Sequence, residues 1–152
     1  MTFFSIRPRI AVPSVESAVN TVRARGLRVS AARRLLIEGL FAASGPVTAE
    51  ELAGGLGGWL PRSDLASACR NLETLERIGL VCHVHLGHGP ARYALATAAE
   101  HEYVACEVCG GFQAVAPSLL DPVRAAVRTA TGHEARFDHF PIVGRCQACA
   151  ER

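Results

Sequence analysis

Apolar residues recur at helical spacing through the first half of the chain and predict four helices. Each predicted helix begins at a residue suited to cap it, and these caps are Ser14, Ser30, Thr48, and Ser63 or Asp64. The fourth helix, expected over 63–78, places Leu72 and Leu75 on one face and polar residues on the other. Gly26 and Gly79 suit the ends of the first and fourth helices.

The period changes from helical to alternating in "LVCHVHLGHGPARYAL", residues 80–95. Two runs of strand-forming residues flank "GHGP", which is typical of a turn, so a β-hairpin is expected. Helices followed by a hairpin are the order of elements in a winged helix-turn-helix. In that fold the 63–78 segment would be the recognition helix and the hairpin would be the wing.

Beyond residue 96 the pattern predicts a strand, a helix and a last strand, with a CxxC motif near each end. The helix in "SLLDPVRAAVRTATG" is expected to begin at Ser118 and end at Gly132. "EARFDHFPIV" is expected to form the last strand. The predicted fold class is α+β, with a winged-helix DNA-binding domain over 1–95 and a small α/β dimerisation and zinc-binding domain over 96–152.

Four cysteines form two CxxC pairs separated by 36 residues, Cys106 with Cys109 and Cys146 with Cys149. In a reducing compartment such pairs favour Zn²⁺ over disulfides, and four thiolates complete its tetrahedral coordination. With no position left for substrate, the predicted role of the zinc is structural. A thiol-redox switch and free buried cysteines are the alternatives.

The composition does not identify a function, but it indicates the class of protein and its compartment. Hydrophobic residues make up 49% and charged residues 20%, which is typical of a globular protein. No apolar run has the length of a membrane span or a signal peptide, so we expect a cytoplasmic protein that does not bind membranes. Residues 1–95 hold 11 Arg and 7 acids (+4), whereas 96–152 hold 5 Arg and 7 acids (−2). This asymmetry suits a DNA-facing N-terminal half.

Five segments in order resemble the ferric uptake regulator (Fur) family of bacterial metal-dependent repressors. "GLRVSAARRLLIEGL" is similar to the opening helix of that family, "VTAEEL" to its next helix, and "SDLASACRNLETLERIGLV" to its recognition helix. "CEVCGGFQAV" and "VGRCQAC" resemble its two zinc motifs. The resemblance covers about Val15 to Cys149. It implies a homodimer that binds a palindromic operator in double-stranded DNA and a regulatory metal that favours the DNA-binding form.

The sequence departs from the family at its metal-sensing positions. Tyr103 stands where the family usually has a histidine, and Cys69 replaces a tyrosine on the recognition helix. Glu100, Glu102, Asp121 and Asp138 fall at the positions of an auxiliary site. That all four are acidic favours a hard cation or no site.

An atypical site for a second divalent metal, zinc or iron, is the remaining candidate for sensing. Its proposed ligands are Cys82, His83, His85, His101 and Glu102. On a regular strand Cys82 faces away from both wing histidines, so a bulge would be needed for all of them to converge. The alternative is that Cys82 packs at the base of the wing and the histidines lie on the surface.

If the 63–78 helix enters the major groove, its N-terminal half supplies the DNA contacts. The candidates are Arg62, Ser63, Ser67, Arg70 and Asn71, with Arg28 as a phosphate contact. Arginine can bind guanine through two hydrogen bonds, and asparagine can bind adenine in the same way. The alternative is an ordinary solvated helix face.

The prediction is therefore a non-enzymatic, DNA-binding transcriptional repressor with one structural zinc. Two other hypotheses stay open at this point. One is a family member that has lost metal sensing and responds to another signal such as thiol oxidation. The other is a zinc-stapled protein-interaction module. An enzyme would need an open zinc position or a reactive cysteine beside a base, and the sequence has neither in a recognisable form.

Overall fold

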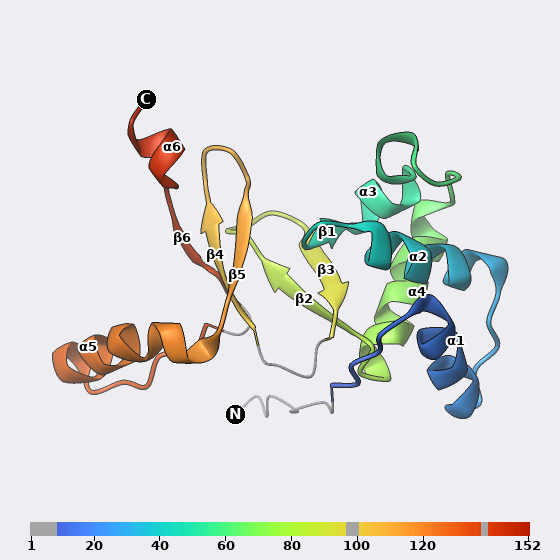
Figure 1. The fold of residues 1–152 in the computed structure, drawn as a ribbon, viewed down its shortest axis with the longest axis horizontal. Coiled ribbons are helices and arrows are strands. Elements are labelled where there is room, and N and C mark those ends of the chain that lie inside the picture. Colours follow the sequence, from blue (N-terminus) through green and yellow to red (C-terminus); the bar gives the residue numbers. More distant parts are fainter. Residues whose placement is uncertain (1–8, 97–100, 138–139) are drawn as a thin grey trace. The chain divides into compact units, whose positions relative to one another are not determined.

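The structure is a computed structural model that describes residues 9–96, 101–137 and 140–152 (Figure 1). The chain forms two compact units. The first comprises Met1–His83 and Arg92–Ala98, and the second comprises Val84–Ala91 and Ala99–Arg152. The division groups the hairpin turn with the second unit, whereas the sequence predicted domains of 1–95 and 96–152.

Four helices build the first unit: α1 Val15–Ala24, α2 Ala31–Ala42, α3 Ala49–Ala53 and α4 Leu65–Arg77 (Figure 1). Each is capped by a side chain that the sequence predicted. Ser14 and Ser30 accept hydrogen bonds from the N–H groups three residues on, and Thr48 forms a capping box with Glu51. At α4 the cap is Asp64, whose carboxylate accepts from the N–H of Ser67 at 2.7 Å.

A hydrophobic core joins these helices. Its largest fully buried side chains come from α1, α2, α4 and the segment that follows α4, and they are Val19, Val22, Ile37, Leu72, Leu75 and Leu80. A three-stranded sheet lies beside the core, with strands β1 Val47–Thr48, β2 Val81–His85 and β3 Ala91–Leu95 in the order β1-β3-β2. The hairpin and the winged helix-turn-helix are confirmed. Strand β1 was not predicted, because two residues carry no periodicity.

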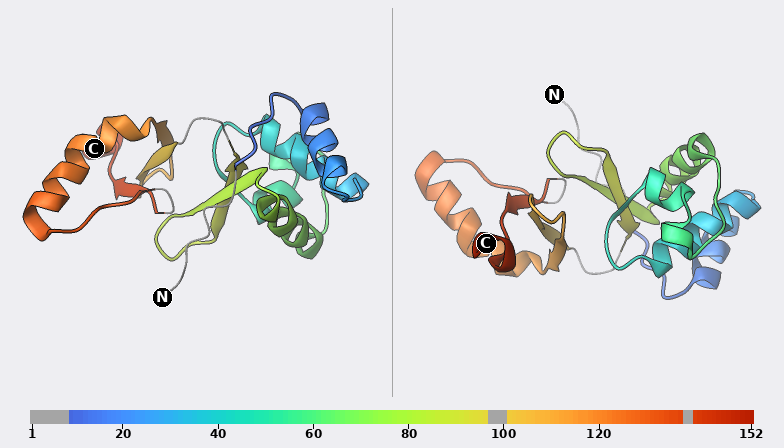
Figure 2. Two further views of the ribbon diagram at one scale, coloured as in Figure 1. Left: turned by 90° about the horizontal axis from the view of Figure 1, so that it is seen from below. Right: turned by 90° about the horizontal axis from the view of Figure 1, so that it is seen from above.

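The second unit has less hydrophobic core. Strands β4 Glu102–Cys106, β5 Phe112–Val115 and β6 Ile142–Gly144 form a sheet in the order β5-β4-β6. Strand β4 is antiparallel to β5 and parallel to β6. Helix α5, Asp121–Thr131, buries none of its side chains and extends away from this sheet, and a short helix, α6 Gln147–Ala150, follows β6 (Figures 1 and 2).

The structure corrects two expectations in this unit. The residues Pro117–Leu120 form a 3₁₀ turn, so Ser118 caps nothing and α5 begins at Asp121. A helix capped by Ser118 would put Pro122 at its fourth position, where proline lacks the N–H needed for the first helical hydrogen bond. The last strand was predicted over 134–143 but covers Ile142–Gly144, and it begins just after Pro141, which cannot donate to the ladder.

The longest helix of the described residues is α4, with 13 residues. Across residues 9–96, 101–137 and 140–152, no helix has the length and apolar character needed to cross a membrane.

Candidate zinc centre and nucleic-acid interface

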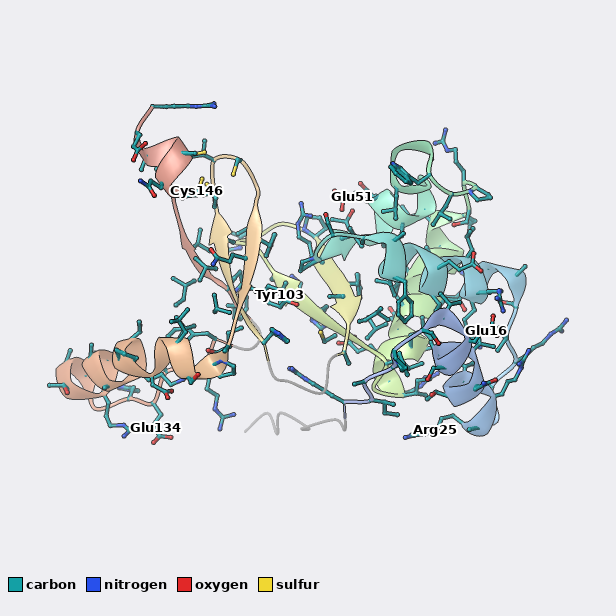
Figure 3. The ribbon with its side chains drawn as sticks, in the orientation of Figure 1. Glu16, Arg25, Glu51, Tyr103, Glu134 and Cys146 are labelled. Atoms are coloured by element: carbon teal, nitrogen blue, oxygen red, sulfur yellow. The ribbon has the colours of Figure 1, made fainter. Side chains whose placement is uncertain are left out.

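The four predicted zinc ligands meet at one end of the second sheet. Cys106 ends β4, and Cys109 lies in the tight turn that follows it. Parallel pairing sets Cys106 opposite Gly144 of β6, so the chain enters the second CxxC beside the first. Cys146 then begins α6 and Cys149 lies within it. Figure 3 shows sulfur atoms gathered around Cys146 at the β4–β5 turn.

The spacing of the sulfur atoms fits a tetrahedral ion. All four Sγ atoms lie within 4.8 Å of one another, and those of Cys109 and Cys146 are 4.0 Å apart. Four thiolates bound to Zn²⁺ at about 2.3 Å would lie about 3.8 Å from each other. All six cysteines of the chain are free thiols, so no disulfide competes with this arrangement. The cluster therefore has the donor set and the dimensions of a structural zinc site.

The electrostatics of the cluster also call for a cation. Backbone N–H groups, first that of Cys109 and then that of Cys146, lower the pKa of Cys106 to about 6. Hydrogen bonding to Cys146, burial and the other nearby thiols raise the pKa of Cys149 to about 12. Without a cation, the cluster therefore favours deprotonation of Cys106 and disfavours deprotonation of Cys149. A dication at its centre removes that opposition, since it stabilises every thiolate that it binds.

The residues predicted for a regulatory metal have protein partners in the first unit. The Sγ atom of Cys82 lies 3.7 Å from the carbonyl oxygen of Ala94, and burial raises the pKa of this thiol. A raised pKa leaves less of the thiolate that binds metals or reacts with oxidants. Nδ1 of His83 lies 2.5 Å from the Oε1 atom of Glu76 near the end of α4.

In the second unit Glu102 is held by an arginine. Its carboxylate is buried and forms an ion pair through Oε1 with Nη2 of Arg124. Nη1 of Arg124 also donates to Asp121 at 3.0 Å and to the carbonyl of Pro117 at 2.8 Å. The guanidinium therefore supplies the positive charge between two carboxylates of the predicted auxiliary site. Glu100 and Asp138, the other two, lie outside the described residues.

The remaining two predicted ligands of the regulatory metal are the histidines His85 and His101. The ring of His85 lies 6.1 Å from that of Phe140, centre to centre, and His101 is half-buried just before β4. Within the described part of the chain, the four cysteines form the one group of three or more His, Cys, Asp or Glu residues whose ligand atoms converge. The regulatory site built on these histidines stays a prediction.

The proposed DNA-reading face of α4 is polar and exposed. Ala68, Leu72 and Leu75 are buried beneath it, while Arg70 is exposed on the helix and Arg62 just before it. Arg28 is exposed ahead of α2, as a phosphate contact would need to be. Ser67 is half-buried, with its N–H used by the helix cap.

Two other candidate DNA contacts are directed into the protein. Nδ2 of Asn71 donates to the carbonyl oxygen of Ser67 at 2.9 Å, and its Oδ1 accepts from Nε of Arg33 at 2.9 Å. The Oγ atom of Ser63 is buried without a hydrogen-bond partner among the described residues. In this conformation Asn71 joins α4 to α2, and the hydroxyl of Ser63 lies away from the surface.

Sequence reasoning missed three residues that organise these sites: Arg33, Glu76 and Arg124. Each bonds to a residue that had been predicted as a DNA contact or metal ligand. Arginine and glutamate on helix surfaces are common, and their partners lie 7 to 38 positions away. Only the charges of Glu102 and Asp121, which would repel one another without a cation, could have pointed to Arg124.

The fold and the sites together define a winged-helix regulator with a four-cysteine zinc centre, and comparisons with known proteins agree. The model of the ferric uptake regulator family matches residues 24–137. The peroxide operon regulator of Bacillus subtilis is 26% identical over 143 residues, which cover 94% of this chain and 98% of that protein. The ferric uptake regulator of Helicobacter pylori shares the fold, with a TM-score of 0.70 and 19% identity, covering 94% of this chain and 98% of that one.

A zinc uptake regulator solved in complex with zinc and DNA shares the fold too, with a TM-score of 0.59 and 19% identity over 90% of this chain and 93% of that one. Because the family model spans three quarters of the sequence, the chain belongs to the ferric uptake regulator family. It is a DNA-binding transcriptional regulator of that family.

Proposed function

We propose that the protein is a homodimeric repressor that binds a palindromic operator through α4, with one structural zinc in each subunit. The single observation that carries the proposal is the exposed face of α4, which presents Arg70 to solvent above the buried Leu72 and Leu75. A rigid helix with an arginine on its outer face suits the major groove, where arginine binds guanine. The likeness in fold to the regulator solved with zinc and DNA supports the same role.

Dimerisation is inferred from α5. This helix buries none of its own side chains, and Leu119 just before it and Val123 on it are 65% and 40% exposed. An apolar helix face of this kind is favourable only when another surface covers it. A second copy of the chain would supply that surface and would place two α4 helices for a two-fold operator.

The proposal is tested with duplexes selected by the protein from random-sequence DNA. Arg70→Ala should abolish specific binding while the oligomeric state stays the same, because the arginine is exposed and supports no packing. Arg77→Ala at the other end of α4 is the matched control and should keep the specificity. Normal specificity in Arg70→Ala would move the reading surface off α4.

For the signal, we infer that DNA affinity is not set by a metal held on Cys82, His83 and Glu102. Cys82 and His83 are engaged with protein groups, Glu102 is paired with Arg124 through Oε1, and Cys82 has a raised pKa. Elemental analysis after mild chelation should therefore find about one zinc per subunit, with operator affinity unchanged. A second, removable ion on which affinity depends would contradict the inference.

Thiol oxidation is the second candidate signal. Cys109 and Cys146 are exposed within the zinc cluster, and the Bacillus subtilis relative is named as a peroxide regulator. Oxidation of zinc-bound thiolates to disulfides releases the metal and would release DNA with it. Peroxide should then lower operator affinity and free zinc in parallel. Loss of affinity with the zinc retained would place the oxidised group elsewhere.

A further inference from the structure

The turn between α3 and α4 carries a large apolar side chain outside the sites described so far. Trp59 is 84% exposed, the highest value among the exposed large hydrophobic residues of the described chain. It is the one tryptophan of the protein. An indole left in water gives up the favourable burial that most tryptophans reach, so its exposure calls for an explanation.

The turn holds Trp59 outward through a fixed backbone. The N–H groups of Gly58 and Leu60 donate to the carbonyl of Gly55 at 3.1 and 3.0 Å, and that of Ser63 donates to Ala53 at 2.8 Å. Gly55 has a φ of +80°, and a Cβ there would lie 2.1 Å from the carbonyl oxygen of Leu60. Only glycine fits such a close approach, so the turn is closed by backbone geometry.

The neighbours of Trp59 anchor the turn to the core. The Cδ1 atoms of Leu56 and Leu60 lie 3.8 and 3.4 Å from where a Cβ on Gly39 of α2 would be. Leu56 also has a φ of +51°, the one positive value among the described non-glycine residues. A leucine in the left-handed region is strained, and backbone strain of this kind is concentrated at functional sites. Trp59 thus lies between two half-buried leucines that anchor the turn to the core.

The charge around Trp59 indicates what would cover it. Arg62 follows three residues on and is exposed, and residues 52–63 contain no acid. Along the sequence Asp64 is the nearest carboxylate, and it is bound to the N-terminus of α4 as the helix cap. The turn leads directly into the helix that reads DNA, so a duplex held by α4 would bring its sugar-phosphate backbone to this turn.

We propose that Trp59 is a DNA contact, packing its ring on a deoxyribose beside the half-site while Arg62 binds the adjacent phosphate. The indole N–H is a donor that a phosphate oxygen can accept. This contact adds affinity without reading bases, so it positions α4 in the groove. The inference rests on the proposed function, because it requires that α4 binds duplex DNA.

The test uses the full-length, zinc-loaded protein and the duplex selected by the wild-type chain. Because Trp59 is the sole indole, its emission reports on this turn alone. Adding the duplex should shift the emission to shorter wavelength and reduce quenching by acrylamide. Both changes should saturate at the midpoint that labelled-DNA anisotropy gives.

Three variants separate packing from charge. Trp59→Ala should weaken binding by roughly tenfold, the scale of one aromatic contact to nucleic acid, and Trp59→Phe should weaken it less. Neither should change the salt dependence, since the indole is uncharged. Arg62→Ala should reduce the salt slope by about one. Trp59 is outside the core, so thermal unfolding should be unchanged and a folding defect can be recognised.

If Arg70→Ala abolishes binding but the emission is unaltered by DNA, or Trp59→Ala keeps wild-type affinity, the proposed Trp59 contact is wrong. Emission that changes with protein concentration in the absence of DNA would assign Trp59 to contacts between copies of the chain instead. Failure of the proposed function is distinct, because the wild-type protein would then select no duplex at all.

Discussion

The two units of this chain reach stability in different ways. In the first, six large side chains are fully buried between helices that are each capped by a side chain. In the second, α5 buries none of its side chains, neither α5 nor α6 has a side-chain cap, and four cysteines converge instead. A unit with so little core would need the zinc, and the partner surface proposed above, because burial alone cannot offset the entropy of folding.

The largest effect is expected from removing a zinc ligand, which should destabilise the second unit alone. Cys146→Ser should release about one zinc per subunit and unfold the second unit, since structural zinc contributes on the order of 10 kcal/mol to folding. Serine can still cap α6, so the loss would come from the missing thiolate. Elemental analysis and circular dichroism measure both results. Cys82→Ser, outside the cluster, is the control, and retained zinc in Cys146→Ser would refute the assignment.

The next largest effect is expected from a core substitution, which should destabilise the first unit alone. Leu72→Ala should lower the free energy of unfolding of the first unit by about 2–5 kcal/mol, through lost burial and a cavity, and should leave the zinc content unchanged. Urea denaturation measures the change. Leu65→Ala on the same helix is the matched control, because Leu65 is 42% exposed and its loss should cost little. Equal effects of the two variants would argue against the core described here.

The third prediction concerns the partner surface. Val123→Asp should weaken dimerisation on the order of a hundredfold, because a carboxylate would be desolvated against an apolar face. Sedimentation equilibrium measures the dissociation constant. Ala125→Asp, exposed on another side of α5, should leave it unchanged. A dimer of normal strength in Val123→Asp would place the interface on another element.

The smallest effect concerns the helix caps. Ser30→Ala should cost about 1 kcal/mol of stability in the first unit, since it removes the acceptor for the N–H of Arg33. Ser118→Ala should cost nothing measurable, because Ser118 lies in the 3₁₀ turn and caps no helix. Thermal unfolding of both variants compares the two serines directly. A loss in Ser118→Ala equal to that in Ser30→Ala would favour the helix start that the sequence predicted.

Local chemistry explains which parts of the fold could be predicted. The caps Ser14, Ser30 and Thr48 act on N–H groups three residues away, and Gly132 ends α5 within its own turn, so a short window of sequence contains the whole interaction. The two CxxC pairs were recognisable for a similar reason. Each pair offers two thiols three positions apart, and a tetrahedral ion needs two such pairs.

The sequence by itself therefore determined the winged-helix order of elements, the zinc donor set and the family. Only the tertiary structure decided the partners of the residues between these features. It joined Asn71 to Arg33, His83 to Glu76, and Glu102 to Arg124, and so directed predicted DNA and metal contacts into the protein. Such pairs depend on how helices and strands pack. A charged side chain can pair with any of several oppositely charged groups in the sequence. Which of them becomes its partner depends on which one the fold brings close.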